Sequence, residues 1–246
     1  MDKRARAQLP DRLVALTFDD GSISDRTLIG PLLKQCGFGA TFFVNKGGGA
    51  FKQSERYMSW DDVKWLSDAG FEIGNHTYTH DIFRVGPNSK ERFAKDIEAL
   101  ENEFSIHNIP RAESFCYCRF RHTSSAVKVL QEKKYTYGRR GVAPEFKCTD
   151  MGDRGPTYEP LRHHPLLLPT TGTVGPNFTF NDFIWAVEQA KNNKIAILCF
   201  HGIPDIHPNI SIESDTFKKY MGYLYTNDYI VVALRDMKKY VTWYRI

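Results

Sequence analysis

Short apolar runs alternate with amphipathic stretches along most of the chain. Runs rich in β-branched and aromatic residues predict eight strands, at residues 13–18, 40–44, 71–73, 113–117, 135–137, 166–168, 195–200 and 229–233. The first and the seventh are apolar at nearly every position, which is typical of strands buried on both faces. These two strands are therefore expected at the centre of a sheet.

Seven amphipathic stretches between these runs predict helices, at residues 25–35, 60–68, 90–104, 124–133, 180–192, 216–225 and 236–244. Ser59 and Asp62 have the spacing of a capping box, and Gly37 and Gly70 fall where a helix ends in a left-handed residue. The repeated order of strand and helix predicts an α/β fold with a parallel sheet and helices outside it. The periodicity does not separate a closed barrel from an open sheet.

The length of 246 residues fits one domain, with residues 1–10 as a flexible extension and residues 11–246 as the folded unit. A net charge of +4 is too small to indicate a nucleic-acid partner, and the apolar runs are too short to span a membrane. The N-terminus is basic but lacks the apolar stretch of a leader. Five cysteines without a paired spacing predict free thiols rather than disulfides.

Titratable and polar side chains recur directly after the predicted strands, where the carboxyl ends of parallel strands meet. In chain order they are Asp19 and Asp20, Asn45, Asn75 with His76 and His80, Cys118 and Arg119, Arg139 and Arg140, and His201. Polar residues spread at random over the surface would not concentrate at the carboxyl ends of the strands. The pattern therefore predicts a functional site there.

His76 and His80 are four residues apart, so in a helical turn both imidazoles face one side and can bind one cation. The adjacent carboxylates Asp19 and Asp20 point to opposite sides of an extended segment, which allows one to bind metal and the other to face its water. His201 could supply a proton. Each motif alone has a structural reading, as a helix cap, a surface histidine or a hydrogen-bonded strand end, but their joint occurrence favours a site.

Four segments, LTFDDG, SWDDVKWLSDAGFEIGNHTYTH, ESFCYC and ILCFHG, resemble the NodB-type polysaccharide deacetylases of carbohydrate esterase family 4, from about residue 13 to residue 232. The resemblance implies a distorted (β/α) barrel, often with seven strands. It also implies Asp20, His76 and His80 as metal ligands, Asp19 as the general base and His201 as the general acid. The implied cofactor is a divalent transition metal, foremost Zn²⁺, with Co²⁺ or Ni²⁺ as alternatives.

The third motif of the family implies a backbone N–H for the oxyanion at residues 118–120, assigned to Arg119, with Tyr117 and Arg139 as further candidates near the substrate. The chain departs from the family here, because Cys116 stands where other members have the arginine that orients the base. Arg139 or Arg140 is a candidate replacement. An Asp-x-x-Asp-Trp motif that tunes the catalytic histidine is also missing, and Asp150 and Asp153 do not match it.

The implied function is metal-dependent removal of N- or O-acetyl groups from a carbohydrate polymer or oligosaccharide. Two alternatives stay open: a metal-independent hydrolase of small linear amides or ureides, and a carbohydrate-binding relative without catalysis. The resemblance suggests a secreted or periplasmic protein, whereas the sequence without a leader leaves the cytoplasm open. The expected partner is an acetylated carbohydrate, and the sequence does not predict an oligomeric state.

Overall fold

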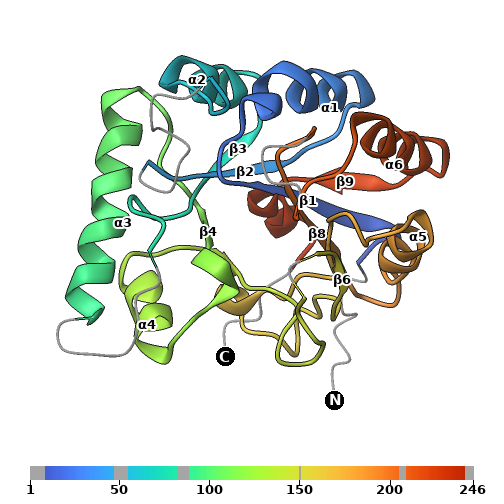
Figure 1. The fold of residues 1–246 in the computed structure, drawn as a ribbon. Helices are drawn as coiled ribbons and strands as arrows, with labels where there is room; N and C mark the ends of the chain where they lie inside the picture. The colour runs from blue at the N-terminus through green and yellow to red at the C-terminus, as the bar shows by residue number, and fades with distance from the viewer. Residues whose placement is uncertain (1–8, 47–54, 82–88, 150, 205–208, 242–246) are drawn as a thin grey trace.

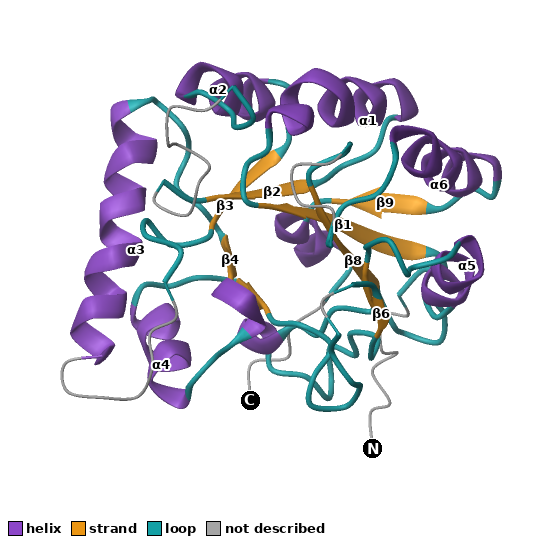
Figure 2. Ribbon diagram, viewed as in Figure 1, coloured by secondary structure: helices purple, strands orange, loops and turns teal. Residues whose placement is uncertain are grey.

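The computed structural model describes residues 9–46, 55–81, 89–149, 151–204 and 209–241. They form one twisted sheet in the order β5-β4-β3-β2-β1-β8-β7-β6, with β9 paired to β1 (Figures 1 and 2). Every pairing is parallel except that of β6 with β7. The strands are β1 (Leu13–Asp19), β2 (Thr41–Val44), β3 (Glu72–Asn75), β4 (Ser114–Cys116), β5 (Tyr137–Arg139), β6 (Asp153–Arg154), β7 (Gly172–Thr173), β8 (Ala196–His201) and β9 (Ile230–Val232).

The sheet curls into a distorted barrel, as the family resemblance implied. The segment before β7 joins the two sides, because the Leu168 N–H donates to the Gly138 carbonyl oxygen at 2.7 Å and the Thr171 N–H donates to the Ile197 carbonyl oxygen, also at 2.7 Å. This segment therefore links β5 to β8. The described sheet has nine strands rather than seven, because β6 and β7 are two-residue strands that hydrophobic patterning does not detect.

Helices cover the outside of the sheet, with α3 and α4 beside β4 and with α5 and α6 beside β8 and β9 (Figure 1). They are α1 (Gly30–Cys36), α2 (Trp60–Asp68), α3 (Ser89–Ile106), α4 (Ser124–Glu132), α5 (Phe180–Glu188) and α6 (Ser214–Thr226), with a π-helical turn η1 (Asp25–Ile29) before α1. Short 3₁₀ turns are η2 (Cys118–Phe120), η3 (Pro165–Leu167) and η4 (Leu234–Lys239).

Several local predictions are confirmed and two are wrong. Ser59 and Asp62 form the capping box of α2, and Gly37 ends α1 with a φ of 70°. The strand predicted at residues 166–168 is the turn η3, which begins at Pro165. The helix predicted at residues 236–244 is the short turn η4 in its described part, and residues 242–244 lie outside the described residues. Proline fixes φ near the helical value and lacks an N–H, so it favours a turn over a central strand at this point.

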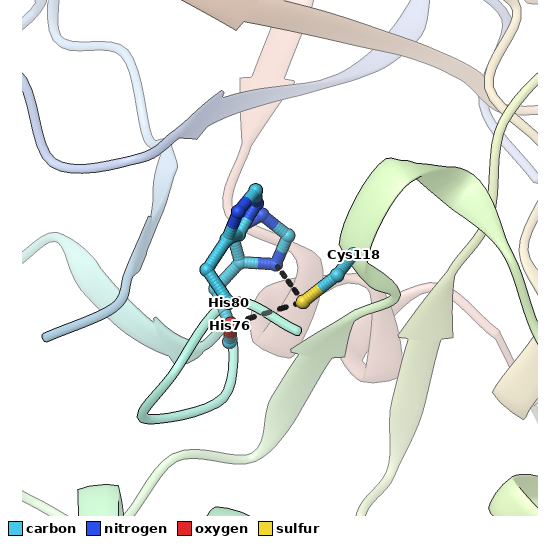
Figure 3. Close-up of side chains that lie close together, drawn as sticks. All are labelled: His76, His80 and Cys118. Carbon is cyan, nitrogen blue, oxygen red and sulfur yellow. Dashed lines mark hydrogen bonds between the residues drawn. The ribbon is translucent and has the colours of Figure 1, made fainter. Parts of the chain in front are cut away.

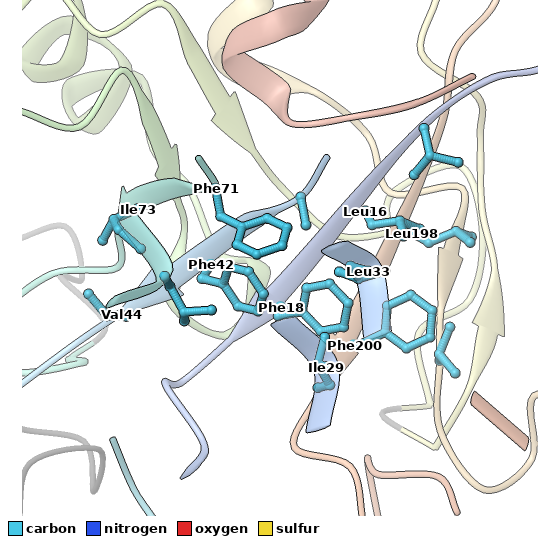
Figure 4. Packing of buried hydrophobic residues seen from close by; sticks show 14 of the residues in the cluster. Leu16, Phe18, Ile29, Leu33, Phe42, Val44, Phe71, Ile73, Leu198 and Phe200 are labelled. Carbon is cyan, nitrogen blue, oxygen red and sulfur yellow. The ribbon is translucent and has the colours of Figure 1, made fainter. Parts of the chain in front are cut away.

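The strand β1 is buried on both faces and separates two hydrophobic clusters. Val14, Leu16 and Phe18 face the outer layer, where the ring of Phe18 stacks on Phe42 at 5.0 Å and on Phe200 at 5.2 Å (Figure 4). Leu13 and Ala15 belong to the second cluster, on the opposite face of β1. Because side chains alternate along a strand, Asp19 continues the face of Leu13 and Ala15.

Candidate active site

The carboxyl end of β1 brings the two adjacent aspartates to the rim of the barrel. Asp19 is the last residue of the strand and is in register with His201 at the end of β8. The next residues, Asp20 and Gly21, have φ values of 74° and 71°, so the chain turns sharply as it leaves the sheet. This turn separates the two carboxylates, since Asp19 remains in the strand while Asp20 lies in the loop.

Asp20 lies between two histidines from the loop after β3. Its Oδ1 atom is 3.3 Å from His80 Nε2 and 3.5 Å from His76 Nε2, and Asn45 Nδ2 donates to the same oxygen at 3.1 Å. One carboxylate oxygen and two imidazole nitrogens thus approach a common point. Two histidines and one carboxylate are a common protein contribution to a catalytic metal site, which leaves coordination positions open.

The two histidines do not lie on a helix, so the helical turn predicted from their spacing is wrong. Residues 76–81 form an irregular loop in which Thr77 and His80 have positive φ values of 64° and 55°. The buried carboxylate of Asp96 in α3 fixes this loop, since it accepts hydrogen bonds from the N–H groups of Tyr78 at 3.1 Å and Thr79 at 3.3 Å. Sequence reasoning missed Asp96, because a single polar residue in an amphipathic helix gives no signal.

Cys118 lies against His76, and its Sγ atom forms with His76 and His80 a group whose ligand atoms all lie within 4.8 Å of one another, which is close enough to hold a metal ion. Its Sγ atom is 4.0 Å from His76 Nδ1 and 3.4 Å from the His76 carbonyl oxygen (Figure 3). His76 Nδ1 is already 2.9 Å from the carbonyl oxygen of Cys116. A carbonyl only accepts, so Nδ1 carries a hydrogen, and Nε2 is the atom that can bind a metal when the ring is neutral. The thiol of Cys118 therefore packs beside the imidazole and adds a further candidate ligand atom next to the two histidines.

Asp19 has different surroundings from Asp20. It is 1% exposed and forms an ion pair with Arg139, whose guanidinium is fully buried at the end of β5. His201 Nε2 is 3.8 Å from the same carboxylate oxygen, Oδ2. Of the two arginines considered from the sequence, Arg139 therefore pairs with Asp19, whereas Arg140 pairs with Glu145. The structure thus brings Asp19, Arg139 and His201 together.

The electrostatics of the site favour ionised carboxylates, a neutral His80 and a protonated His76. Burial would lower the pKa of His76, but its contacts with Cys116, Cys118 and Asp20 raise this pKa well above 6.5. Burial would raise the pKa of Asp19, but the charge of Arg139 outweighs it and lowers this pKa. Burial would also raise the pKa of Asp20, yet the hydrogen bond and charge of His76 lower it. Burial and the neighbouring His76 lower the pKa of His80 to about 4. An imidazole must be uncharged to bind a metal ion, so Asp20 and His80 are already in the binding form, whereas His76 would have to release a proton.

The loop after β4 carries the remaining predicted residues. Arg119 has a left-handed conformation, with φ 49° and ψ 31°. The amides of Phe120 and Arg121 donate to carbonyls of the same turn, so Cys118 and Arg119 are the candidate oxyanion donors of this segment. Tyr117 is buried and its hydroxyl donates to the Leu166 carbonyl oxygen at 2.9 Å. Its hydrogen bond therefore supports the loop packing.

Among the described residues, His201 Nδ1 has no carboxylate partner of the kind that the family motif would supply. This atom is buried and forms no hydrogen bond within the part of the chain that the structure describes. Asp153 instead accepts hydrogen bonds from the N–H and hydroxyl of Thr149, and Asp150 lies outside the described residues. Burial lowers the pKa of His201, although the charge of Asp19 opposes this shift.

A curled parallel sheet with a carboxylate pair and histidines at its carboxyl rim has the architecture of the carbohydrate esterase 4 barrels. Residues 6–138 match the family model for polysaccharide deacetylases, so the chain belongs to this family. A curated relative, a chitin deacetylase from Colletotrichum lindemuthianum, is 38% identical over 68 residues, which are 28% of this chain and 27% of the relative. The matched segment thus spans about a quarter of that relative.

Solved structures show the same fold at low sequence identity. The Xyl-CE4 domain of a multidomain xylanase from the hindgut metagenome of Trinervitermes trinervoides is 14% identical, with a TM-score of 0.61 over 94% of this chain and 91% of that domain. A family 4 carbohydrate esterase from Bacillus anthracis is 18% identical, with a TM-score of 0.56 over 95% and 86%. A CE4 family pseudoenzyme from Bacillus anthracis is 16% identical, with a TM-score of 0.57 over 92% and 65%.

Proposed function

We propose that this protein is a metal-dependent hydrolase that removes acetyl groups from a carbohydrate. The observation that carries the proposal is that the two neighbouring carboxylates have different partners. Asp20 lies between the Nε2 atoms of His76 and His80, while Asp19 is held apart by Arg139. A protein that only binds sugar needs neither this ligand set nor a second, separately paired carboxylate.

The residues present fit a divalent transition metal. Asp20, His76 and His80 would hold it, and the donor set suits Zn²⁺, with Co²⁺ and Ni²⁺ as alternatives. Asp19 Oδ1 is buried without a hydrogen bond among the described residues, as expected of an atom whose partner is a reactant. When bound, such a metal lowers the pKa of water and polarises a carbonyl group.

The side chains around this point then have distinct roles in the proposed reaction. Asp19 takes a proton from the attacking water, and His201 gives a proton to the departing amine or hydroxyl group. Arg119 is left-handed in the turn after β4, and its N–H group and that of Cys118 are the candidate oxyanion donors there. These amides would bind the oxyanion of the tetrahedral intermediate.

A cavity of about 830 Å³ borders the site and is large enough for sugar units. The cavity meets the site at Thr77, which lies between the two histidines in the chain, and at Cys118, whose Sγ atom is 3.3 Å from Thr77 Oγ1. The proposed metal ligands and acid–base groups lie behind this wall and do not line the cavity. Tyr117 and Phe120 add aromatic surface, and Arg121 adds a charged group. This mixture of aromatic and polar surface suits a carbohydrate.

Acetate release tests the proposal directly. Purified protein loaded with Zn²⁺ is incubated with N-acetylated chitooligosaccharides, the substrate class suggested by the chitin deacetylase relative, and separately with O-acetylated xylooligosaccharides. We expect acetate from one of these and its loss after chelation. Metal-loaded protein that binds sugar without releasing acetate would contradict the proposal and support a binding protein. Activity on small amides or ureides that survives chelation would support the metal-independent alternative.

The compartment stays a prediction. Among the described residues, no helix is both long and apolar enough to cross a membrane. The family resemblance alone favours a secreted or periplasmic location.

A further inference from the structure

We infer that Arg139 is the positioning residue that orients the general base, and that it leaves Asp19 Oδ1 as the atom that accepts the proton. The inference rests on the proposed hydrolase function. It assigns the orientation of Asp19 to a residue at the end of β5, because Cys116 cannot form an ion pair with the carboxylate as an arginine at that position would.

The ion pair between the two residues is shielded from bulk solvent. The side chain of Arg139 is 0% exposed and that of Asp19 is 2% exposed, and Arg139 Nη2 donates to Asp19 Oδ2. A single buried charge without its partner is strongly unfavourable, so each residue depends on the other for its place in the barrel. The two come from β5 and β1, which are separated in the sheet by three other strands. The contact therefore crosses the interior of the barrel.

Other groups fix the guanidinium itself. Arg139 Nη1 donates to Thr170 Oγ1 at 3.2 Å, and the Thr170 hydroxyl donates to the Arg140 carbonyl oxygen at 2.6 Å. The rings of Phe43 and Phe120 lie 5.5 Å and 5.4 Å from the guanidinium carbon. Hydrogen bonding and aromatic contact together restrict the group to one position. A rigid guanidinium can hold the carboxylate in a defined orientation.

The two oxygens of Asp19 are unequal. Oδ2 receives Arg139 Nη2, lies 3.5 Å from the Sγ atoms of both Cys116 and Cys199, and is 3.8 Å from His201 Nε2. Oδ1 has no hydrogen bond within the described residues and is buried. A buried carboxylate oxygen without a partner needs a reason. Crowding at Oδ2 leaves Oδ1 as the free acceptor, so an O–H bond of the attacking water breaks as the Oδ1–H bond forms.

Cys116 provides the space that this arrangement needs. It is in register with Arg139 on the neighbouring strand, and its Sγ atom is 2.7 Å from Arg139 Nη2. A longer side chain at position 116 would occupy the volume of the guanidinium. The small side chain of Cys116 on β4 therefore leaves the space that the guanidinium of Arg139 on β5 occupies.

A double-mutant cycle separates positioning from general support of the fold. Arg139→Met is expected to lower kcat by at least about 100-fold, as small misplacements of a catalytic group do, with KM changed by less than about threefold. Zn²⁺ affinity, measured by competition with a chelator, stays at the wild-type value. In an Asp19→Asn background the same substitution has no further effect on the residual kcat, because the group it positions is gone. The matched control Arg140→Met keeps kcat within about threefold.

Unfolding of the metal-free protein gives a readout independent of activity. Arg139→Met alone lowers Tm by about 10 °C, because it leaves Asp19 buried and unpaired, and Asp19→Asn with Arg139→Met recovers most of this loss. Additive effects of the two substitutions on both kcat and Tm would overturn the inference. If wild-type protein releases no acetate, the proposed function fails and the Tm cycle still tests the pair. If Asp19→Asn abolishes activity but Arg139→Met does not, only the role of Arg139 fails.

Discussion

His76 Nδ1 lies 2.9 Å from the main-chain carbonyl oxygen of Cys116, a contact that sets the tautomer of a proposed metal ligand. The carbonyl belongs to β4 and the histidine follows β3, so pairing of neighbouring strands fixes the ring. Nε2 consequently faces Asp20 as an acceptor of a cation. The hydrogen bond from Nδ1 to the Cys116 carbonyl oxygen therefore fixes the orientation of the His76 ring, although His76 lies in an irregular loop.

The adjacent aspartates should separate metal binding from turnover. Asp20→Ala is expected to lose the metal, because it removes the carboxylate between the two histidines. Asp19→Asn should retain the metal and lose most of the activity, because the amide cannot accept the proton. Metal content by atomic emission and acetate release measure the two effects. Equal metal loss in both variants would contradict the separate roles.

Asp96 is not a proposed ligand, but it should increase the metal affinity because it holds the loop that carries His80. Asp96→Ala removes the acceptor for two N–H groups of the loop that carries His80, so Zn²⁺ affinity should fall by about 10- to 100-fold. Calorimetric titration with Zn²⁺ measures the change. Glu98→Gln on the same helix is the control, because its side chain is 56% exposed and pairs with Lys133. An unchanged affinity in Asp96→Ala would show that the loop holds its shape without this carboxylate.

Cys118 should be dispensable for metal binding. Cys118→Ala removes a thiol that contacts His76 but leaves the bond between His76 Nδ1 and the Cys116 carbonyl oxygen in place. We expect Zn²⁺ affinity within about threefold of wild type, as for substitutions that remove no ligand. Spectra of the Co²⁺-substituted protein provide a second measurement, because thiolate ligation gives a characteristic charge-transfer band. A band that disappears in Cys118→Ala would identify the thiol as a ligand.

Asp25 should limit stability at neutral pH. It is fully buried, and neither carboxylate oxygen has a hydrogen bond within the described residues. Burial, with the charges of Asp20 and Asp19, raises its pKa well above 3.8. Above pH 3.8 the folded protein holds a proton that the unfolded chain releases, so stability falls as the pH rises through this window. Asp25→Asn should therefore increase the free energy of unfolding at pH 8 by about 1–3 kcal/mol.

Chemical denaturation at pH 8 and at pH 4 measures this effect. The gain from Asp25→Asn should shrink toward pH 4, where the carboxyl is increasingly protonated in the unfolded chain as well. The exposed Asp228 provides the control, since Asp228→Asn should change stability by less than about 0.5 kcal/mol at either pH. A gain for Asp25→Asn that does not depend on pH would point to a packing effect instead.

The hydrophobic pattern was sufficient for the parallel sheet and for the rim that carries the site. Strand β1 is apolar on both faces because helices cover one side and the barrel interior the other, so a continuous apolar run had one main interpretation. The same pattern missed the two-residue strands β6 and β7. Strands this short contain no period, and their pairing depends on what lies beside them.

The identities of the proposed ligands and acid–base groups came from local motifs, because each motif lies at the carboxyl end of a strand or in the loop after it. These motifs are Asp19 with Asp20, His76 with His80, and His201. Their contacts were decided by tertiary structure. The sequence left Arg139 and Arg140 as equal candidates, since neighbouring residues in a strand differ only in the face to which they point. Closure of the barrel directs Arg139 to Asp19 and leaves Arg140 to Glu145. Which residues of two distant strands form a buried ion pair depends on how the sheet closes, and the spacing of residues in the sequence does not predict this.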